Sequence, residues 1–284
     1  MTAPTTMDRT VVSSDPPLEP KARFSDLFAA EWIKLWSLRS TLWAFAATAA
    51  LVLTSTASNA RGDAQQYARH GEEQRALFRL LGTVADSFPS GSATMLMIGA
   101  GAIGAATVLG EYASGLIRTT FTAVPARSSV MAAKVAVVIV ATTVFGVLVA
   151  FASYGAAQAV LSGQDAAVGL GHAGIMRLLV ASTLLAPVSA LVGMGVATVI
   201  RQSVFTIVVT TALLFVLPTL FNDGNRLSAS FLHMTVLQAW GRIGVGQAAG
   251  EDWPWTVGGA CIVLAVWTLV AAATTIFSSN RRDQ

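Results

Sequence analysis

Six stretches of this chain lack any Asp, Glu, Lys or Arg over a length close to the 20 or so apolar residues that cross a membrane as a helix. They are residues 41–57, 93–109, 135–160, 178–200, 204–221 and 255–277. Hydrophobic residues make up 54% of the chain and charged residues 12%, whereas soluble domains have about 25% charged residues. Transmembrane β-strands would alternate apolar and polar residues, but these stretches are apolar on all sides. The sequence therefore predicts an all-α integral membrane protein with six transmembrane helices.

The expected helices form a single transmembrane domain that covers residues 21–284. With their flanking residues they are placed at about 41–58, 92–110, 131–161, 175–200, 203–221 and 255–277. Residues 1–20 are polar and proline-rich, and they lack the early apolar core of a cleavable signal peptide. We therefore expect a disordered tail at the N-terminus.

Lys and Arg are more frequent on one side of the predicted membrane. With six spans, the side that holds both termini carries eleven of these residues and the opposite side carries seven. Four of the seven lie in one long loop of mixed charge, residues 58–90. Cytoplasmic loops are enriched in Lys and Arg, so both termini are predicted to be cytoplasmic.

Residues 23–39 have the pattern of an amphipathic helix in the cytoplasmic membrane interface. At about 100° per residue, Arg23, Asp26, Lys34 and Ser37 fall on one face. The other, broad face holds the apolar side chains Phe24, Leu27, Phe28, Trp32, Leu35, Trp36 and Leu38. Trp and basic side chains suit the headgroup level. Glu31 lies within the apolar face, so we expect it to meet a cation or a groove of a protein. The alternative is a simple N-terminal extension of the first span.

A polar, basic break, GEYASGLIRTTFTAVPARSSVMAAK, separates the second and third apolar stretches. Glu111 closes the second span, Gly115 permits a turn, and Pro125 ends any helix formed by the LIRTTF segment. Arg127 and Lys134 flank the start of the third span. The pattern predicts a short helix parallel to the membrane between two hinges.

That helix has the side chains needed to dock on a soluble partner. Leu116, Ile117 and Phe121 could fill a cleft, while Arg118 meets a carboxylate. The simpler alternative is an ordinary cytoplasmic loop whose charge only orients the chain.

The sequence lacks the residue patterns that several kinds of binding and catalysis require. None of the three lysines follows a glycine, so the chain has no phosphate-binding loop, and ATP would have to bind a separate chain. The three histidines show no ligand spacing, Cys261 is the single cysteine, and no carboxylate is expected to be buried. We therefore expect no metal site and no catalytic residue, and the modest net charge of +3 does not call for a nucleic-acid partner.

Two further segments carry structural expectations. The glycine-rich GAGAIGAA in the second span is expected to let helices approach closely. The last external loop, residues 222–254, contains an apolar stretch too short to span, which fits either re-entrant half-helices or a surface loop.

The pattern E-Y-x-x-G-x-I-R-x-T-x-x-A-x-P-x-R, followed by A-K, resembles the first cytoplasmic loop of ABC-2 type transporter permeases. The segments AEWIKLWSLRSTLW and RRDQ also resemble bacterial members of that family. The resemblance implies a multi-pass permease of the bacterial inner membrane with an N-terminal elbow helix. It assigns elbow roles to Glu31, Trp32, Lys34 and Arg39, and coupling roles to Glu111, Tyr112, Gly115, Leu116, Ile117, Arg118, Thr119, Phe121, Pro125 and Arg127.

The resemblance also implies partners. The loop would dock on an ABC ATPase subunit that binds ATP and Mg²⁺, and a second permease copy or a paralogue would flank the substrate path. The uncharged spans favour an apolar or amphipathic cargo, exported across the membrane. A non-transporting immunity, sensor or scaffold subunit with the same fold remains the alternative from another class.

Overall fold

A computed structural model describes residues 23–69, 71–77, 83–115, 127–164, 167–172, 174–246 and 253–281. Every regular element in these ranges is helical. Five helices are long and apolar enough to cross a membrane. They are α2 (Arg39–Arg69), α5 (Ser90–Ser114), α7 (Arg127–Leu161), α8 (Ile175–Ile200) and α13 (Val257–Arg281). The prediction of an all-α, multi-pass membrane protein is confirmed at this level.

Shorter helices occupy both ends and one side of this bundle. They are α1 (Phe24–Ser37), α3 (Glu72–Leu77), α4 (Thr83–Ser87), η2 (Ser162–Gln164), α9 (Ser203–Thr211), η3 (Ala212–Val216), α10 (Leu217–Thr219), α11 (Arg226–His233) and α12 (Val236–Gly244). The helices α11 and α12 occupy the segment for which the sequence left both a re-entrant and a surface placement open.

Two predicted spans differ in length from the helices that form. The first, expected at 41–58, continues to Arg69, because the start of the mixed-charge loop extends the same helix. The fifth, expected at 203–221, consists of nine α, five π and three α residues that end at Thr219. At 1.5 Å per residue this segment reaches about 25 Å, short of the roughly 30 Å hydrocarbon core. It is apolar but falls below the length of the five spans.

Helix α8 forms the centre of the bundle. In its most apolar stretch 72% of the residues are buried, compared with 22% in α2 and in α13. It packs against α5, α7, α12 and α13. The outer helices therefore turn most of their apolar surface toward the surroundings, as expected of helices whose solvent is lipid.

Glycines bring α5 and α8 into backbone contact. A Cβ added at Gly104 would lie 1.9 Å from the carbonyl oxygen of Ala190, and one added at Gly193 would lie 1.9 Å from that of Gly101. Small residues allow this approach, and dispersion between closely packed backbones favours it. The expected role of the GAGAIGAA segment is confirmed.

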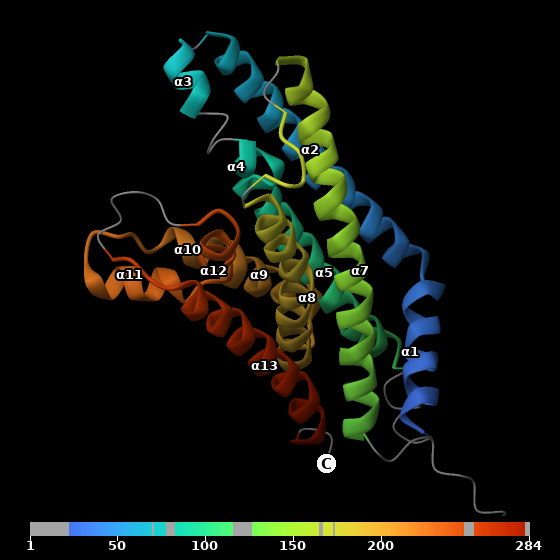
Figure 1. The fold of residues 1–284 in the computed structure, drawn as a ribbon. Helices are drawn as coiled ribbons and strands as arrows, with labels where there is room; N and C mark the ends of the chain where they lie inside the picture. The colour runs from blue at the N-terminus through green and yellow to red at the C-terminus, as the bar shows by residue number, and fades with distance from the viewer. Residues whose placement is uncertain are drawn as a thin grey trace, which may run out of the picture.

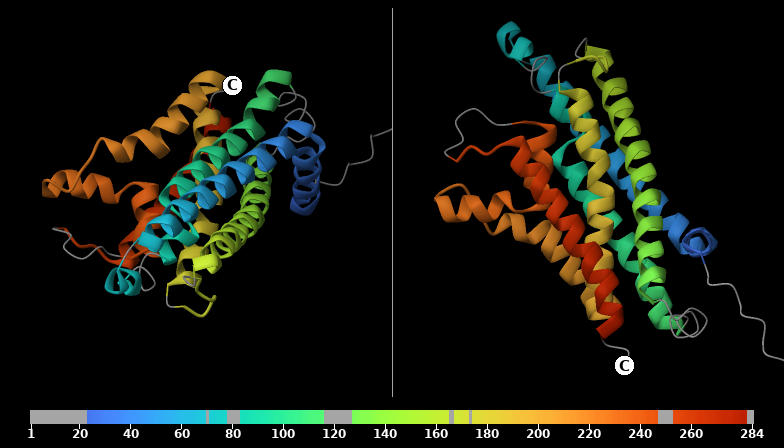
Figure 2. Two further views of the ribbon diagram at one scale, coloured as in Figure 1. Left: turned by 90° about the horizontal axis from the view of Figure 1, so that it is seen from above. Right: turned by 60° about the horizontal axis from the view of Figure 1, so that its bottom comes forward.

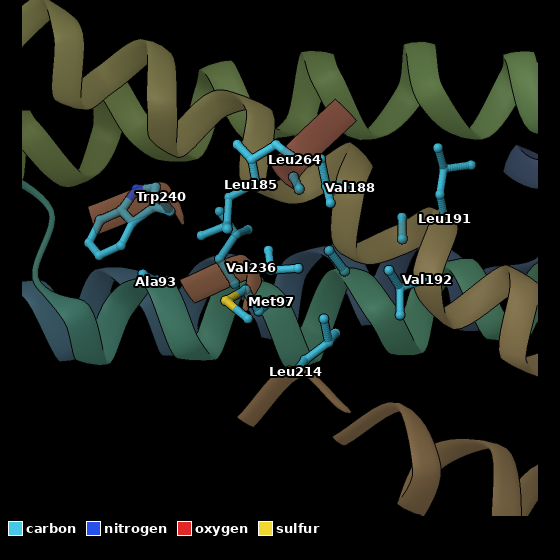
Figure 3. Close-up of a cluster of buried hydrophobic side chains, with 14 of the residues drawn as sticks. Ala93, Met97, Leu185, Val188, Leu191, Val192, Leu214, Val236, Trp240 and Leu264 are labelled. Atoms are coloured by element: carbon cyan, nitrogen blue, oxygen red, sulfur yellow. The ribbon is translucent and has the colours of Figure 1, made fainter. Parts of the chain in front are cut away.

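The bundle has two distinct ends (Figure 1). We call the end that holds α1, the start of α7 and the end of α13 the basal end, and the end that holds α3, α4 and the start of α8 the apical end. Helices α9 to α12 project to one side (Figures 1 and 2). Helix α9 packs on α5 and α8. Helix α12 packs on α8 and α13, and its Trp240 and Val236 lie beside Ala93 and Met97 of α5 (Figure 3).

Candidate functional site

Helix α1 is attached to the basal end by its apolar face. Its first turn is capped where the backbone N–H of Arg23 donates to Asp26 at 3.2 Å. Leu35 is buried against Val137 and Ala141 of α7. In Figure 2 (right) α1 is seen nearly end-on while α7 is seen from the side, so the two helices cross. Leu38, with φ −87° and ψ 115°, breaks the helical backbone between α1 and α2, so α1 is a separate element and not a continuous extension of the first span.

A row of aromatic rings continues this attachment onto α2 and α7. Trp32 and Trp36 of α1 have centroids 5.9 Å apart, and Trp36 stacks on Phe45 at 5.5 Å. Phe45 meets Phe145 edge-on at 4.8 Å. Such contacts add to the burial of apolar area, and they hold α1 in a defined position on the bundle.

Beneath α1, four charged side chains from three helices form a closed ring. Lys34 donates to Glu31 at 2.7 Å and to Glu111 at 3.2 Å. Lys134 donates to Glu111 at 2.9 Å and also forms an ion pair with Glu31. Acid and base alternate around the ring, so each charge has two opposite neighbours. We call this group, Glu31, Lys34, Glu111 and Lys134, the basal ion ring.

Three members of the ring are buried, Lys34 is partly exposed, and the four charges balance. Glu31 is 5% exposed, Glu111 9% and Lys134 4%. Burial lowers the pKa of Lys34, but its hydrogen bond to Glu31 and the charges of both carboxylates outweigh burial and raise that pKa above 10.5. The resulting stabilisation is fully present below pH 10.5 and is lost only as the pH rises through the higher folded-state pKa. Removing a single member would leave an uncompensated buried charge.

A second contact joins the turn between α8 and α9 to the same place. The guanidinium of Arg201 lies 4.8 Å from the ring centroid of Tyr112, the residue after Glu111. Arg201 has φ +57°, a left-handed conformation that is uncommon for residues other than glycine. Tyr112 also packs with Val130 and Met131 of α7. The end of α5 is thus held by α1, α7 and the α8–α9 turn together.

The predicted coupling loop begins and ends at this site. Glu111 and Tyr112 lie in the last turn of α5, and Gly115 ends that helix with φ +71°, which fits the predicted turn. Arg127 is the first residue of α7. The remaining predicted coupling residues lie outside the described residues, namely Leu116, Ile117, Arg118, Thr119, Phe121 and Pro125.

The structure joins residues that sequence reasoning had kept apart. Glu31 and Lys34 were predicted for the elbow and Glu111 for the loop, and all three belong to one ring. Glu31 finds the cation expected from the cost of a carboxylate on an apolar face. Lys134 was noted only as a flank of the third span. The feature of the sequence that could have identified Lys134 is its position one to two turns inside an apolar helix, where a charge needs a partner.

Two other predicted residues lie outside the basal ion ring, and one expectation from the sequence is wrong. Trp32 belongs to the aromatic row, whereas Arg39 is exposed at the start of α2 and takes no part in the ring. We expected no buried carboxylate, but Glu31, Asp86 and Glu111 are all buried, because neighbouring helices pack over α1, α4 and the end of α5. Among the described residues, no group of three or more His, Cys, Asp or Glu side chains could hold a metal ion.

Neither a scan against protein-family models nor a search of curated proteins found a match to this chain.

Proposed function

We propose that this chain is the transmembrane permease subunit of an ABC-2 type transporter, an exporter of an apolar or amphipathic substrate driven by a separate ATPase subunit. The observation that carries the proposal is the basal ion ring. It ties α1 to both helices that flank the loop between Gly115 and Arg127, the loop with the coupling pattern.

The ring suggests how force would pass from the loop into the bundle. A partner that moves the loop would move the end of α5 and the start of α7. Helix α1 would follow, because its Glu31 carboxylate is held by Lys134 and its Lys34 ammonium by Glu111. The backbone contact at Gly104 and Gly193 would pass the movement of α5 to α8. Binding of ATP to the partner would shift this equilibrium only to the extent that the partner grips the two states with different affinity.

The proposal includes an assembly. The segment Ser203–Thr219 would complete six spans, with both termini in the cytoplasm of a bacterial cell. A second copy or a paralogue would cover lipid-facing surface and complete the substrate path. ATP and Mg²⁺ would bind only on the ATPase subunit, so this chain would not itself be an enzyme. Its three lysines, none of which follows a glycine, support that division.

Isolation from the membranes of its own host cell tests the proposal. The tagged chain is extracted in mild detergent, the co-purifying proteins are identified by mass spectrometry, and ATP hydrolysis is measured in the eluate. We expect an ABC ATPase chain and ATP hydrolysis with the wild type, and loss of most of both with Arg118→Glu. A reversed charge on the docking helix would repel the carboxylate that the wild-type arginine meets.

The matched control is Arg61→Glu, the same charge reversal at an exposed site toward the apical end of α2. It should leave the ATPase bound. If the wild-type chain elutes without any ATPase, the transporter proposal fails and the immunity, sensor or scaffold function takes its place. If Arg118→Glu retains the ATPase in full, the docking role of the loop is wrong.

A further inference from the structure

A second buried carboxylate lies at the opposite, apical end, far from the basal ion ring. Asp86 of α4 is 6% exposed. One of its oxygens accepts a hydrogen bond from the side-chain amide of Asn59 at 3.2 Å. The same amide donates to Asp63 at 2.8 Å, so Asn59 bridges the two carboxyl groups, and burial together with the neighbouring Asp63 carboxyl raises the pKa of Asp86. The second oxygen of Asp86 is buried without any hydrogen-bond partner.

In the part of the chain that the structure describes, no cation balances this pair. Among the described residues, neither Asp63 nor Asp86 forms an ion pair, in contrast to the four carboxylate–ammonium contacts of the basal ring. Two adjacent carboxylates, one of them buried, cannot both remain ionised at low cost.

The helices packed most closely on α4 are α2, α7 and α8, and none of their described Lys or Arg side chains forms an ion pair with Asp63 or Asp86. Arg61 of α2 is exposed. Helix α7 has no Asp, Glu, Lys or Arg after Lys134, and the hydroxyl of Tyr154 donates to the carbonyl of Val168. Arg177 of α8 is exposed and lies beside Gly246, and His172 precedes α8 with an interaction of its own. The pair therefore depends on its own two carboxyl groups and on Asn59.

We propose that Asp63 and Asp86 bind one proton between them and that this shared proton joins α2 to α4. The shared proton gives the unpaired oxygen of Asp86 a hydrogen bond. Leaving a buried polar atom without one costs considerable free energy. The folded state holds this proton more tightly than the unfolded chain does. The stabilisation is therefore present in acid and is lost as the pH rises, when the second carboxyl ionises and the two charges repel.

The site makes the apical end of the bundle sensitive to protons on its own side of the membrane. This inference does not rest on the proposed transport function, since it concerns only residues of this chain at the end away from the predicted coupling loop. Its test is correspondingly independent of any ATPase.

The test compares wild type with Asp86→Asn, because an asparagine amide donates to Asp63 at every pH. Unfolding temperature is measured in lipid nanodiscs from mildly acidic to mildly alkaline buffer. We expect ionisation of the pair to lower the unfolding temperature of the wild type by about 2–4 °C as the pH rises across this range. The unfolding temperature of Asp86→Asn should lack this contribution. Asp223→Asn, at an exposed site in the loop before α11, is the control and should keep the wild-type slope.

Infrared difference spectroscopy gives a direct second readout on the wild type. A protonated carboxyl band should be present at neutral pH, disappear in alkali and be absent from Asp86→Asn. If Asp86→Asn fails to fold, Asp63→Asn replaces it, since that site is only half-buried. An unchanged slope in the variant, or the absence of the band, would overturn the proposal. So would stabilisation of the wild type, but not of the variant, by added Ca²⁺ or Mg²⁺, because the pair would then hold a cation.

Discussion

Lys134 is the residue on which the basal ion ring depends most. It lies in a helix of high hydropathy, it is almost fully buried, and it serves two carboxylates from two other helices. A buried ion pair adds little net stability compared with a well-packed apolar pair, but it fixes the register of the groups that form it. We infer that the ring is retained to align α1, α5 and α7, and that its members depend strongly on one another.

A double-mutant cycle measures this dependence. Lys134→Met leaves an excess negative charge in the ring and Glu111→Gln an excess positive one, so each is expected to cost about 3–5 kcal/mol in unfolding free energy. The double variant leaves the balanced pair Glu31–Lys34 and should cost clearly less than the sum. Chemical denaturation in detergent gives the three values. Strict additivity would show that the two side chains do not interact.

At the scale of elements, the contact of α5 with α8 is decided by backbone rather than by side chains. Gly104 and Gly193 each face a carbonyl group across the interface, and neither site has room for a methyl group. Pro187 contributes to close packing at the interface of α8 with α7. It has no N–H for the carbonyl of Thr183, one turn earlier, and Gly146 of α7 packs directly on that carbonyl. Helix packing around α8 is thus specified by small residues on α8 itself and on its partners.

Two alanine substitutions on one helix separate packing from helix propensity. Gly104→Ala drives a methyl group into the backbone of α8 and should destabilise the bundle by about 1–3 kcal/mol, the usual cost of overpacking. Gly110→Ala, on the same helix, meets nothing within 4 Å and should be neutral or stabilise by up to about 1 kcal/mol. Unfolding temperatures of both proteins in one detergent provide the measurement. Equal effects would refute the close-contact role of Gly104.

For the whole molecule, the arrangement of ends matters most to function. The first described residues, the last helix and both ends of the predicted coupling loop gather at the basal end (Figures 1 and 2). The basal ion ring and the Arg201–Tyr112 contact lie there, whereas the Asp63–Asp86 pair lies at the apical end. If the basal end is cytoplasmic, one end is placed to meet a soluble partner and the other to meet external protons.

Cysteine labelling tests this orientation. Cys261 is exposed on α13, so it is first changed to serine. In that background Ser128→Cys, at the basal start of α7, should react with a membrane-impermeant maleimide only after the cells are permeabilised. Ser162→Cys, just after the apical end of the same helix, should react in intact cells; both positions are exposed. The reverse pattern would place the coupling loop outside the cell and contradict the proposed docking on an ATPase.

The sequence alone determined the class of fold, the amphipathic helix at 23–39, the close approach at the glycine-rich segment and the need of Glu31 for a cation. These are local properties. Hydropathy over about 20 residues selects a lipid-facing helix, whose backbone bonds are made within the segment itself.

Only the tertiary structure decided that Lys134 joins the local Lys34 at Glu31, since Lys134 lies 103 residues away in the chain. It likewise decided that Asp86 faces Asp63, that α2 continues beyond its apolar stretch, and that the fifth apolar segment ends short of a full span. The physical reason is that partners between helices depend on the rotation and depth of each helix. Packing around α8 sets both, and no pattern within a single helix records them.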